Sequence, residues 1–325
     1  MSMKKVKIIT FGAATQDVYM YGPGLHAHRS PNGHGYVEQF PLGAKVNVEH
    51  TYFDTGGGAT NAAVTFARQG LEVEFVGKIG RDAAGDEVLR ALGTENVDAS
   101  RAVYDDKHGT GYSVLLLAPT GERTALVYRG ASHELKAADV DVARLDADWF
   151  YITSLAGNFD LLSKLLKHAS LKGIKVAIDP GAAELAEPVR LRELLTMVTV
   201  LKSNAGELKQ LFGGDTLRHS VAAGAKVCPV VVGTNSVSGF IAAAYGHLYK
   251  GGVYDPKAKV VDRNGAGDAF GSGLVSALAR GDSVEDALTL ASANATAVVA
   301  TLGAKPGILR AGVALKPMKL EITDL

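Results

Sequence analysis

Short apolar runs alternate with segments of helical periodicity along most of the chain. Apolar runs bounded by glycine, proline or polar residues predict strands, and apolar residues that recur every three or four positions predict helices. The predicted strands cover residues 6–12, 73–77, 148–152, 174–179, 198–202 and 229–232, and the predicted helices cover residues 60–69, 159–172, 205–212, 266–280 and 284–301. This alternation indicates an α/β fold with a mostly parallel sheet and helices on both faces.

Two segments interrupt the alternation with patterns typical of β structure. Residues 19–53 are rich in glycine and proline and contain strand-like runs at 36–40 and 45–53. Residues 109–130 hold two strand-like runs, 111–117 and 123–128, around the turn sequence Pro119-Thr120-Gly121-Glu122, which predicts a hairpin. We therefore expect a small β lid, formed by about residues 18–53 and 109–130, on a single domain that covers residues 1–325.

Composition and charge narrow the possible partners. Hydrophobic residues make up 47% and charged residues 21%, which indicates a globular core. The 34 basic and 34 acidic residues cancel, so no general attraction to nucleic acid or to a membrane is expected. No run reaches the roughly 20 apolar residues of a membrane span. The only cysteine, Cys228, lies in an apolar run and is expected to be buried, and a cytoplasmic location is expected.

The strongest candidate for chemistry is Gly265-Ala266-Gly267-Asp268 at the start of a predicted helix. Its small residues let free N–H groups converge at a helix N-terminus, which binds anions. A carboxylate is a poor choice for anion binding, but Asp268 suits a base that deprotonates a hydroxyl attacking a phosphoryl group. From the local pattern alone, an ordinary helix cap made by Asp268 is an equal alternative.

Three weaker candidates lie elsewhere in the chain. Gly56-Gly57-Gly58 precedes a predicted helix and allows a ligand to approach the backbone, and Asn61 in the first turn offers hydrogen bonds to a polyol. Asp17 follows the first strand, where ligands of open α/β sheets bind. Asn204 and Glu207 follow another strand, and Glu207 could hold magnesium through water. For Asn61, Asn204 and Glu207, a structural cap is the alternative.

Other site types fit the sequence less well. Neither glycine-rich segment has the Walker spacing, and Phe270 stands where the dinucleotide pattern requires glycine, which disfavours a dehydrogenase. His26, His28 and His34 lie in the lid segment with no cysteine nearby, which favours a solvated or substrate-facing loop over a zinc site.

Taken together, Gly56-Gly57-Gly58-Ala59-Thr60-Asn61, Asn204-Ala205-Gly206-Glu207 and Asp262 through Asp268 resemble the motifs of the ribokinase-like (PfkB) carbohydrate kinase family in order and separation. The resemblance covers nearly the whole chain. It implies a Rossmann-like sheet with a β lid and ATP-dependent phosphorylation of a sugar or nucleoside hydroxyl. It also implies Mg²⁺ and, in some members, K⁺, and a homodimer through the lid.

The resemblance also implies roles for individual residues. Asp268 would be the base, and the N–H groups of Gly265, Ala266 and Gly267 would form the anion hole. The implied substrate-binding positions are Asp17, Gly57, Gly58, Asn61 and Asn158. The implied nucleotide-binding positions are Asn204, Glu207, Thr234, Ser236, Gly239, Arg263 and Asn294. Glu207 would hold Mg²⁺ through water, and the carbonyls of Asp262 and Asn264 would bind a monovalent cation.

Several positions depart from the pattern of ribokinases proper. Gly58 replaces a usual lysine, Asn158 lies where an acidic residue touches the sugar, and Thr15 replaces an asparagine, which argues against simple ribose as acceptor. Ser236 and Arg263 are departures that spare the anion hole and the base. Arg263 is expected to contact nucleotide phosphate, and a surface arginine with a solvated head is an equal alternative. The main alternative function is a catalytically silent binding protein on the same fold, which would have no need to retain Asp268.

Overall fold

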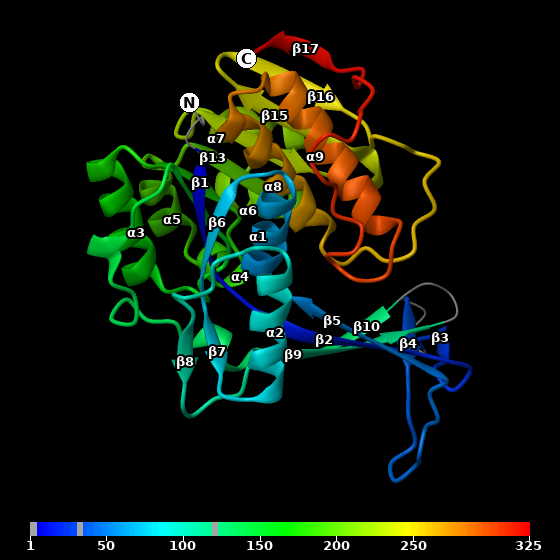
Figure 1. Cartoon of the computed structure of the whole chain (residues 1–325). Coiled ribbons are helices and arrows are strands. Elements are labelled where there is room, and N and C mark those ends of the chain that lie inside the picture. The colour runs from blue at the N-terminus through cyan, green and yellow to red at the C-terminus, as the bar shows by residue number, and fades with distance from the viewer. Residues whose placement is uncertain (1–4, 31–34, 119–122) are drawn as a thin grey trace.

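The computed structural model describes residues 5–30, 35–118 and 123–325. Within them, nine strands form the main sheet in the order β17-β16-β15-β14-β13-β12-β11-β1-β6 (Figure 1). The parallel strands are β1 (Lys7–Phe11), β6 (Glu72–Val76), β11 (Trp149–Ile152), β12 (Lys175–Ile178), β13 (Val200–Asn204) and β14 (Val230–Thr234). The strands β15 (Phe240–Ala244), β16 (His247–Gly251) and β17 (Glu321–Asp324) extend one edge in antiparallel order. The predicted α/β class with a mostly parallel sheet is confirmed.

Helices cover both faces of this sheet because its strands are apolar on both sides. Ile8 and Ile9 are neighbours in β1, yet they belong to separate apolar cores on opposite faces. One core packs against α1 (Gly58–Arg68), α2 (Ala83–Thr94), α8 (Ala266–Arg280) and α9 (Val284–Val299). The other packs against α3 (Phe159–Lys172), α5 (Pro188–Leu195), α6 (Ala205–Phe212) and α7 (Leu217–Gly224), with the short α4 (Ala182–Leu185) beside them.

The helix boundaries follow from local signals. In α3, the side chain of Asn158 caps the first turn and Gly173 ends the helix in a left-handed conformation with φ of 69°. The bounds of α3, α6 and α8 match the sequence-based expectations, because each has a clear start signal and all three end at glycine. Cys228 is buried, as predicted, and burial raises the pKa of its thiol to about 12.

A second sheet lies at one end of the main sheet and forms the lid (Figure 1). In the described part of the chain its strand order is β10-β9-β2-β5, from β2 (Thr15–Tyr21), β5 (His50–Gly56), β9 (Gly111–Leu117) and β10 (Arg123–Tyr128). The β3 (Ala27–Arg29) and β4 (Tyr36–Glu38) pair lies at its far end. The expected turn at 119–122 and His34 fall outside the described residues. The sequence analysis did not identify β2 as a strand, and this strand carries Asp17.

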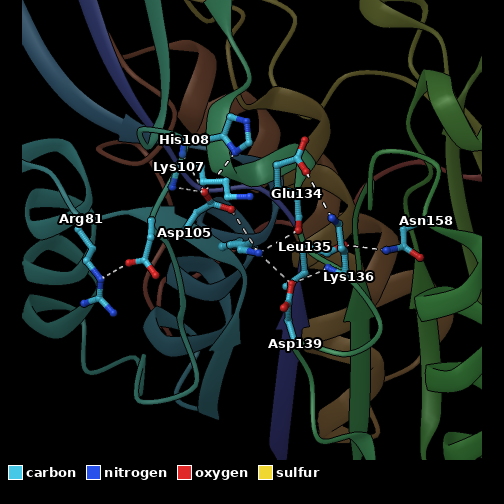
Figure 2. Close-up of polar contacts among 11 residues, drawn as sticks. Arg81, Asp105, Lys107, His108, Glu134, Leu135, Lys136, Asp139 and Asn158 are labelled. Carbon is cyan, nitrogen blue, oxygen red and sulfur yellow. Dashed lines mark hydrogen bonds and ion pairs between the residues drawn. The ribbon is translucent and has the colours of Figure 1, made fainter.

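The base of the lid hairpin is fixed by a network of charged groups (Figure 2). Lys78, in β7 (Lys78–Gly80), pairs with Asp139 at 3.0 Å and with Asp105, in β8 (Val103–Asp105), at 3.3 Å. The Asp105 carboxylate also accepts hydrogen bonds from the backbone of Lys107 and His108 at 2.8 and 2.7 Å. These contacts set where the chain leaves β8 and enters the hairpin.

None of the described helices is long and apolar enough to cross a bilayer.

Candidate active site

A cavity of about 430 Å³, which we name the acceptor cavity, lies between the lid and the carboxyl ends of the main-sheet strands. The chain segments that follow β1, β11 and β12 supply one wall, and the lid strands β2, β9 and β10 supply another. Of the residues expected at the site, this cavity brings together Asp17, Gly57, Gly58, Asn61, Asn204, Glu207, Asn264 and Asp268. Parallel strands place their carboxyl ends at one edge, which explains why residues so far apart in sequence meet here.

Asp268 lies in the first turn of α8, and its carboxylate is held by a neighbouring helix. The Nδ2 of Asn61, in α1, donates a hydrogen bond to Oδ2 of Asp268 at 2.8 Å. No described side chain caps α8, whose N-cap residue is Gly265, so the helix-cap alternative for Asp268 is wrong. The Oδ1 of Asn61 is buried and has no hydrogen-bond partner among the described residues. This arrangement leaves Asp268 facing the cavity and Asn61 with an unused acceptor.

The N-terminus of α8 has the geometry of an anion-binding site. Gly265 adopts a left-handed conformation with φ of 75°, which favours glycine. The first N–H groups of the helix are therefore not satisfied by a side-chain cap, and the helix dipole adds positive potential at the same point. The Nζ of Lys202 lies so close to Gly267 that an added Cβ would be only 2.9 Å from it. Anion binding by Gly265, Ala266 and Gly267 is thus supported by a nearby ammonium.

Lys202 is a site residue that the sequence analysis missed. Its Nζ contacts Oδ2 of Asp179 at 2.8 Å, and both side chains line the acceptor cavity. Burial disfavours the charged form of Lys202, but Asp179, Asp268 and Glu207 outweigh burial and raise its pKa. Burial also raises the pKa of Asp179 to about 6, against the opposing effect of Lys202. Both residues follow apolar strand patterns in the sequence. A charged residue at the carboxyl end of a predicted strand is the signal from which either could have been recognised as a site residue.

Asp17 occupies the middle of the lid face that borders the cavity. Its side chain is 4% exposed and accepts a hydrogen bond from Oγ1 of Thr15 at 3.0 Å. Nδ2 of Asn264 lies 3.5 Å from its Oδ2 and donates more closely, at 2.9 Å, to the hydroxyl of Tyr19. Burial raises the pKa of Asp17, and the positive charge of Lys305 opposes the rise. A carboxylate held in this way is a strong acceptor for hydroxyl groups.

Asp17 belongs to a buried charge cluster with Asp54 and Lys305, which the sequence patterns did not predict. The ammonium of Lys305 donates to the backbone oxygen of Thr55 and lies near the carboxylates of Asp54 and Asp17. Burial lowers the pKa of Lys305 to about 8, against the opposing effect of the two carboxylates. The pKa of Asp54 is raised by burial in the same way. Lys305 thus supplies the positive charge that two buried carboxylates need.

A second cavity, of about 280 Å³, lies on the other side of the α8 N-terminus. It has an apolar wall with Val237, Val253 and Phe270, as expected for a ring system. Of the expected nucleotide-binding positions it is lined by Thr234, Ser236, Gly239 and Arg263, together with Ala266 and Gly267 of the anion hole. Arg263 lies 3.5 Å from the hydroxyl of Ser236. The two cavities therefore meet at the start of α8.

Two expected ligand contacts do not occur. The side chain of Asn158 caps α3 and donates to the backbone oxygen of Leu135 at 2.7 Å, and it does not line the acceptor cavity (Figure 2). The side chain of Asn294 is fully buried, donates to Ala269 O at 2.8 Å and accepts from Leu309 N at 2.9 Å. Both amides are used inside the fold, so assigning them to substrate and nucleotide binding is wrong for this structure.

Asp262, Asn204 and Glu207 combine structural and site roles. The Asp262 carboxylate is buried and accepts from Arg123 at 3.1 Å and from Asn264 N at 2.9 Å, so Asp262 could contribute its carbonyl but not its carboxylate to a cation site. Asn204 and Glu207 form a reciprocal capping box on α6, with bonds of 3.0 and 2.8 Å, and both also line the acceptor cavity. For these two residues, cap and site position are compatible.

The loops at the cavity floor are braced by Glu184, a further residue without a sequence signal. Its buried carboxylate accepts from Ser154 Oγ at 2.9 Å and from three backbone N–H groups at 2.8 to 2.9 Å. These donors belong to the segments that follow β11 and β12, which also line the cavity. One side chain in α4 thus fixes two loops that shape the floor.

A carboxylate at an uncapped helix start, a second, buried carboxylate and two adjoining cavities form the arrangement expected of a small-molecule kinase. The model of the pfkB family carbohydrate kinases matches residues 32–310 of this chain. The chain therefore belongs to the pfkB family of carbohydrate kinases, which are phosphotransferases that act on hydroxyl groups.

Individual relatives agree with this assignment. A ribokinase of Arabidopsis thaliana is 26% identical over 335 residues, which cover 97% of this chain and 82% of the relative. An aminoimidazole riboside kinase of Salmonella typhimurium is 26% identical, over 75% of this chain and 81% of the relative. The solved structure of Arabidopsis thaliana ribokinase with ribose and ATP superimposes with a TM-score of 0.76 at 22% identity, over 94% of this chain and 96% of that chain. The last likeness shows a shared fold.

Proposed function

We propose that this protein transfers the γ-phosphoryl group of ATP to a hydroxyl of a sugar or nucleoside bound between the lid and the main sheet. The observation that carries the proposal is the position of Asp268. Its carboxylate faces the acceptor cavity, is held by Asn61 and lies in the helix turn that borders the second cavity. The names of the relatives, ribokinase and aminoimidazole riboside kinase, support the acceptor class.

Each group in the site has a role in this mechanism. Asp17 accepts hydrogen bonds from acceptor hydroxyls and, with the free Oδ1 of Asn61, orients the reacting hydroxyl. Asp268 takes the hydroxyl proton as the oxygen attacks phosphorus. The N–H groups of Gly265, Ala266 and Gly267 and the ammonium of Lys202 stabilise negative charge on the transferring group. Arg263 binds nucleotide phosphate from the side of the second cavity.

We propose Mg²⁺ as the metal of the reaction, and Glu207 as the residue that holds it through water. One oxygen of Glu207 accepts from Asn204 N, and Glu207 also lines the acceptor cavity. Hard oxygen ligands with retained waters are the coordination that Mg²⁺ prefers. Bound Mg²⁺ supplies charge neutralisation to the phosphates.

A monovalent cation such as K⁺ at the carbonyls of Asp262 and Asn264 is part of the same proposal. Activity measured in potassium, in sodium and in a bulky organic cation tests it. We also propose a cytoplasmic enzyme that binds neither nucleic acid nor membrane, in line with its zero net charge.

We further propose a homodimer through the outer face of the lid. This face exposes Phe53, Leu126 and Tyr128, which are 62%, 56% and 52% exposed. Phe53 lies in β5 and the other two lie in β10, which are the two edge strands of the lid sheet. Exposed apolar residues on one face of a sheet are typical of an interaction surface. Molar mass in solution for the wild type and for Leu126→Glu tests the dimer.

The kinase proposal is tested by ADP release from ATP and Mg²⁺ across a panel of sugars and nucleosides, with Asp268→Asn as the blank. Release that depends on both the acceptor and Asp268 supports the proposal. A protein that binds an acceptor but releases no ADP above the blank would instead be the silent binding protein considered in the sequence analysis.

A further inference from the structure

Two arginines line the acceptor cavity near the two ends of β10. Within β10, Arg123, Ala125 and Val127 line the cavity and alternate along the chain, as residues on one face of a strand must. The intervening residues, such as Leu126, lie on the opposite face. Arg129 follows β10 directly, with a helical backbone conformation, and also lines the cavity. This wall of the cavity is therefore apolar at Ala125 and Val127 and has a positive charge on either side of them.

The side chain of Arg129 makes no polar contact within the described part of the chain. Within residues 5–30, 35–118 and 123–325, its guanidinium makes no ion pair and no side-chain hydrogen bond. Arg123 makes one ion pair, from Nη1 to Oδ1 of Asp262 at 3.1 Å. That carboxylate is already engaged by the backbone N–H groups of Asn264 and Gly303. Arg129 is exposed and lines the cavity, so its guanidinium is available to a ligand there.

The same cavity contains Asp17 and this positive charge. Asp17 lies opposite Ser113, and Ser113 lies opposite Val127, so these three form one row across the lid. Arg129 lies two residues beyond Val127, where the chain has left β10 with φ of -75° and ψ of -33°, and it lines the same cavity as Asp17. One small molecule in this cavity can therefore contact Asp17 with its hydroxyls and Arg129 with another group.

We propose that the physiological acceptor is a hydroxylated small molecule that carries an anionic group, a phosphate ester or a carboxylate, and that Arg129 binds this group. The inference rests on the proposed kinase function and specifies its substrate class. The planar fork of arginine matches two oxygens of a phosphate or carboxylate, whereas a neutral sugar uses neither its charge nor its geometry. Ala125, Val127 and Leu115 then cover the carbon chain between the two polar ends.

The nucleotide phosphates are a less suitable partner for Arg129. The α8 N-terminus, Lys202 and Arg263 already offer positive charge to these phosphates, and Arg263 lines the second cavity, of about 280 Å³. Arg129 lines the acceptor cavity and not this second cavity. A role toward ATP would nevertheless appear as a change in the nucleotide KM, so the experiment below separates the two.

The test uses acceptors in matched pairs. Fructose and fructose 6-phosphate form the phosphate arm, as do ribose and ribose 1-phosphate, and glucose and gluconate form the carboxylate arm. With ATP and Mg²⁺, ADP release gives kcat/KM for each. We expect the anionic member of at least one pair to exceed its neutral partner by 10-fold or more. Arg129→Gln should lower kcat/KM for that anionic acceptor by about 10- to 100-fold and leave the nucleotide KM unchanged.

Arg144→Gln is the matched control, because Arg144 is a solvent-exposed arginine paired with Asp141 and lies outside the cavity. It should keep wild-type kinetics with every acceptor. Equal or better turnover of the neutral members overturns the inference and leaves the kinase function standing. An anionic preference unchanged in Arg129→Gln, or a change in the nucleotide KM alone, also overturns it. A panel with no release above the Asp268→Asn blank overturns both the inference and the kinase function.

Discussion

Nδ2 of Asn61 donates a hydrogen bond to Oδ2 of Asp268 at 2.8 Å and so joins α1 to α8 across 207 residues of sequence. This contact fixes the carboxylate toward the acceptor cavity instead of toward the N–H groups of its own helix. The α8 N-terminus is thereby left for an anion. One hydrogen bond thus holds the Asp268 carboxylate in the position that the proposed base requires.

Asp268→Asn should remove the base and preserve the shape of the site. We expect kcat to fall by about 10²- to 10⁴-fold, because positioned proton transfer contributes that much to catalysis. Nucleotide affinity measured by equilibrium titration should change little. A variant with near-normal kcat would refute the assignment of Asp268 as base.

Asn61→Ala should release the Asp268 carboxylate from its position. Since small displacements of a reacting group are costly, we expect kcat to fall by about 10- to 100-fold with the nucleotide KM unchanged. The acceptor KM should rise as well if Oδ1 binds the acceptor. Normal kcat with a raised acceptor KM would show that Asn61 binds substrate without positioning the base.

Lys202→Met should leave the Asp179 carboxylate buried without its partner. We expect a loss of about 3–5 kcal/mol in the free energy of unfolding, because an unpaired buried charge is costly. The double variant Asp179→Asn/Lys202→Met should recover much of this loss in denaturant unfolding. It should not recover kcat, because the ammonium beside Gly267 is still missing. Recovery of kcat would mean that Lys202 acts only through stability.

Lys305 should make stability depend on pH in the alkaline range. The pKa of Lys305 is about 8 in the folded protein and near 10.5 in the unfolded chain. Between these values the unfolded chain holds the proton and the folded protein does not, so the free energy of unfolding rises with pH. Relative to Lys305→Met, the wild type should gain roughly 1 kcal/mol per pH unit above pH 8.

Below pH 8 the difference between the wild type and Lys305→Met should be constant, because Lys305 is then charged in both states. Urea unfolding at intervals from pH 7 to pH 10 measures the difference. A flat difference across the whole range would show that Lys305 is not perturbed by burial.

Glu184→Gln should loosen the two loops at the cavity floor. The carboxylate accepts four hydrogen bonds, and an amide can accept at only one of its two terminal atoms. We expect a loss of about 2–4 kcal/mol in unfolding free energy. The acceptor KM should rise more than the nucleotide KM, because both loops border the acceptor cavity. Wild-type stability in Glu184→Gln would contradict the bracing role.

The sequence by itself determined the α/β class and the position of the phosphoryl-transfer motif. Strong periodicity with explicit start and stop residues set the bounds of α3, α6 and α8. Gly265 through Asp268 could be identified because glycine conformation and helix N-termini are local properties. The resemblance of the spaced motifs then indicated the kinase class, which the match of the family model confirms.

Only the tertiary structure decided which polar side chains face a ligand. Asn158 and Asn294 look like site residues in the sequence, yet each finds partners inside the fold. Lys202 and Lys305 look like ordinary lysines, yet long-range packing buries them beside carboxylates. The alternation along β10 predicted a strand but not which face meets the cavity, because that depends on pairing with β9 and β2. A side chain's partner is a property of the assembled fold, whereas its backbone preference is a property of the chain.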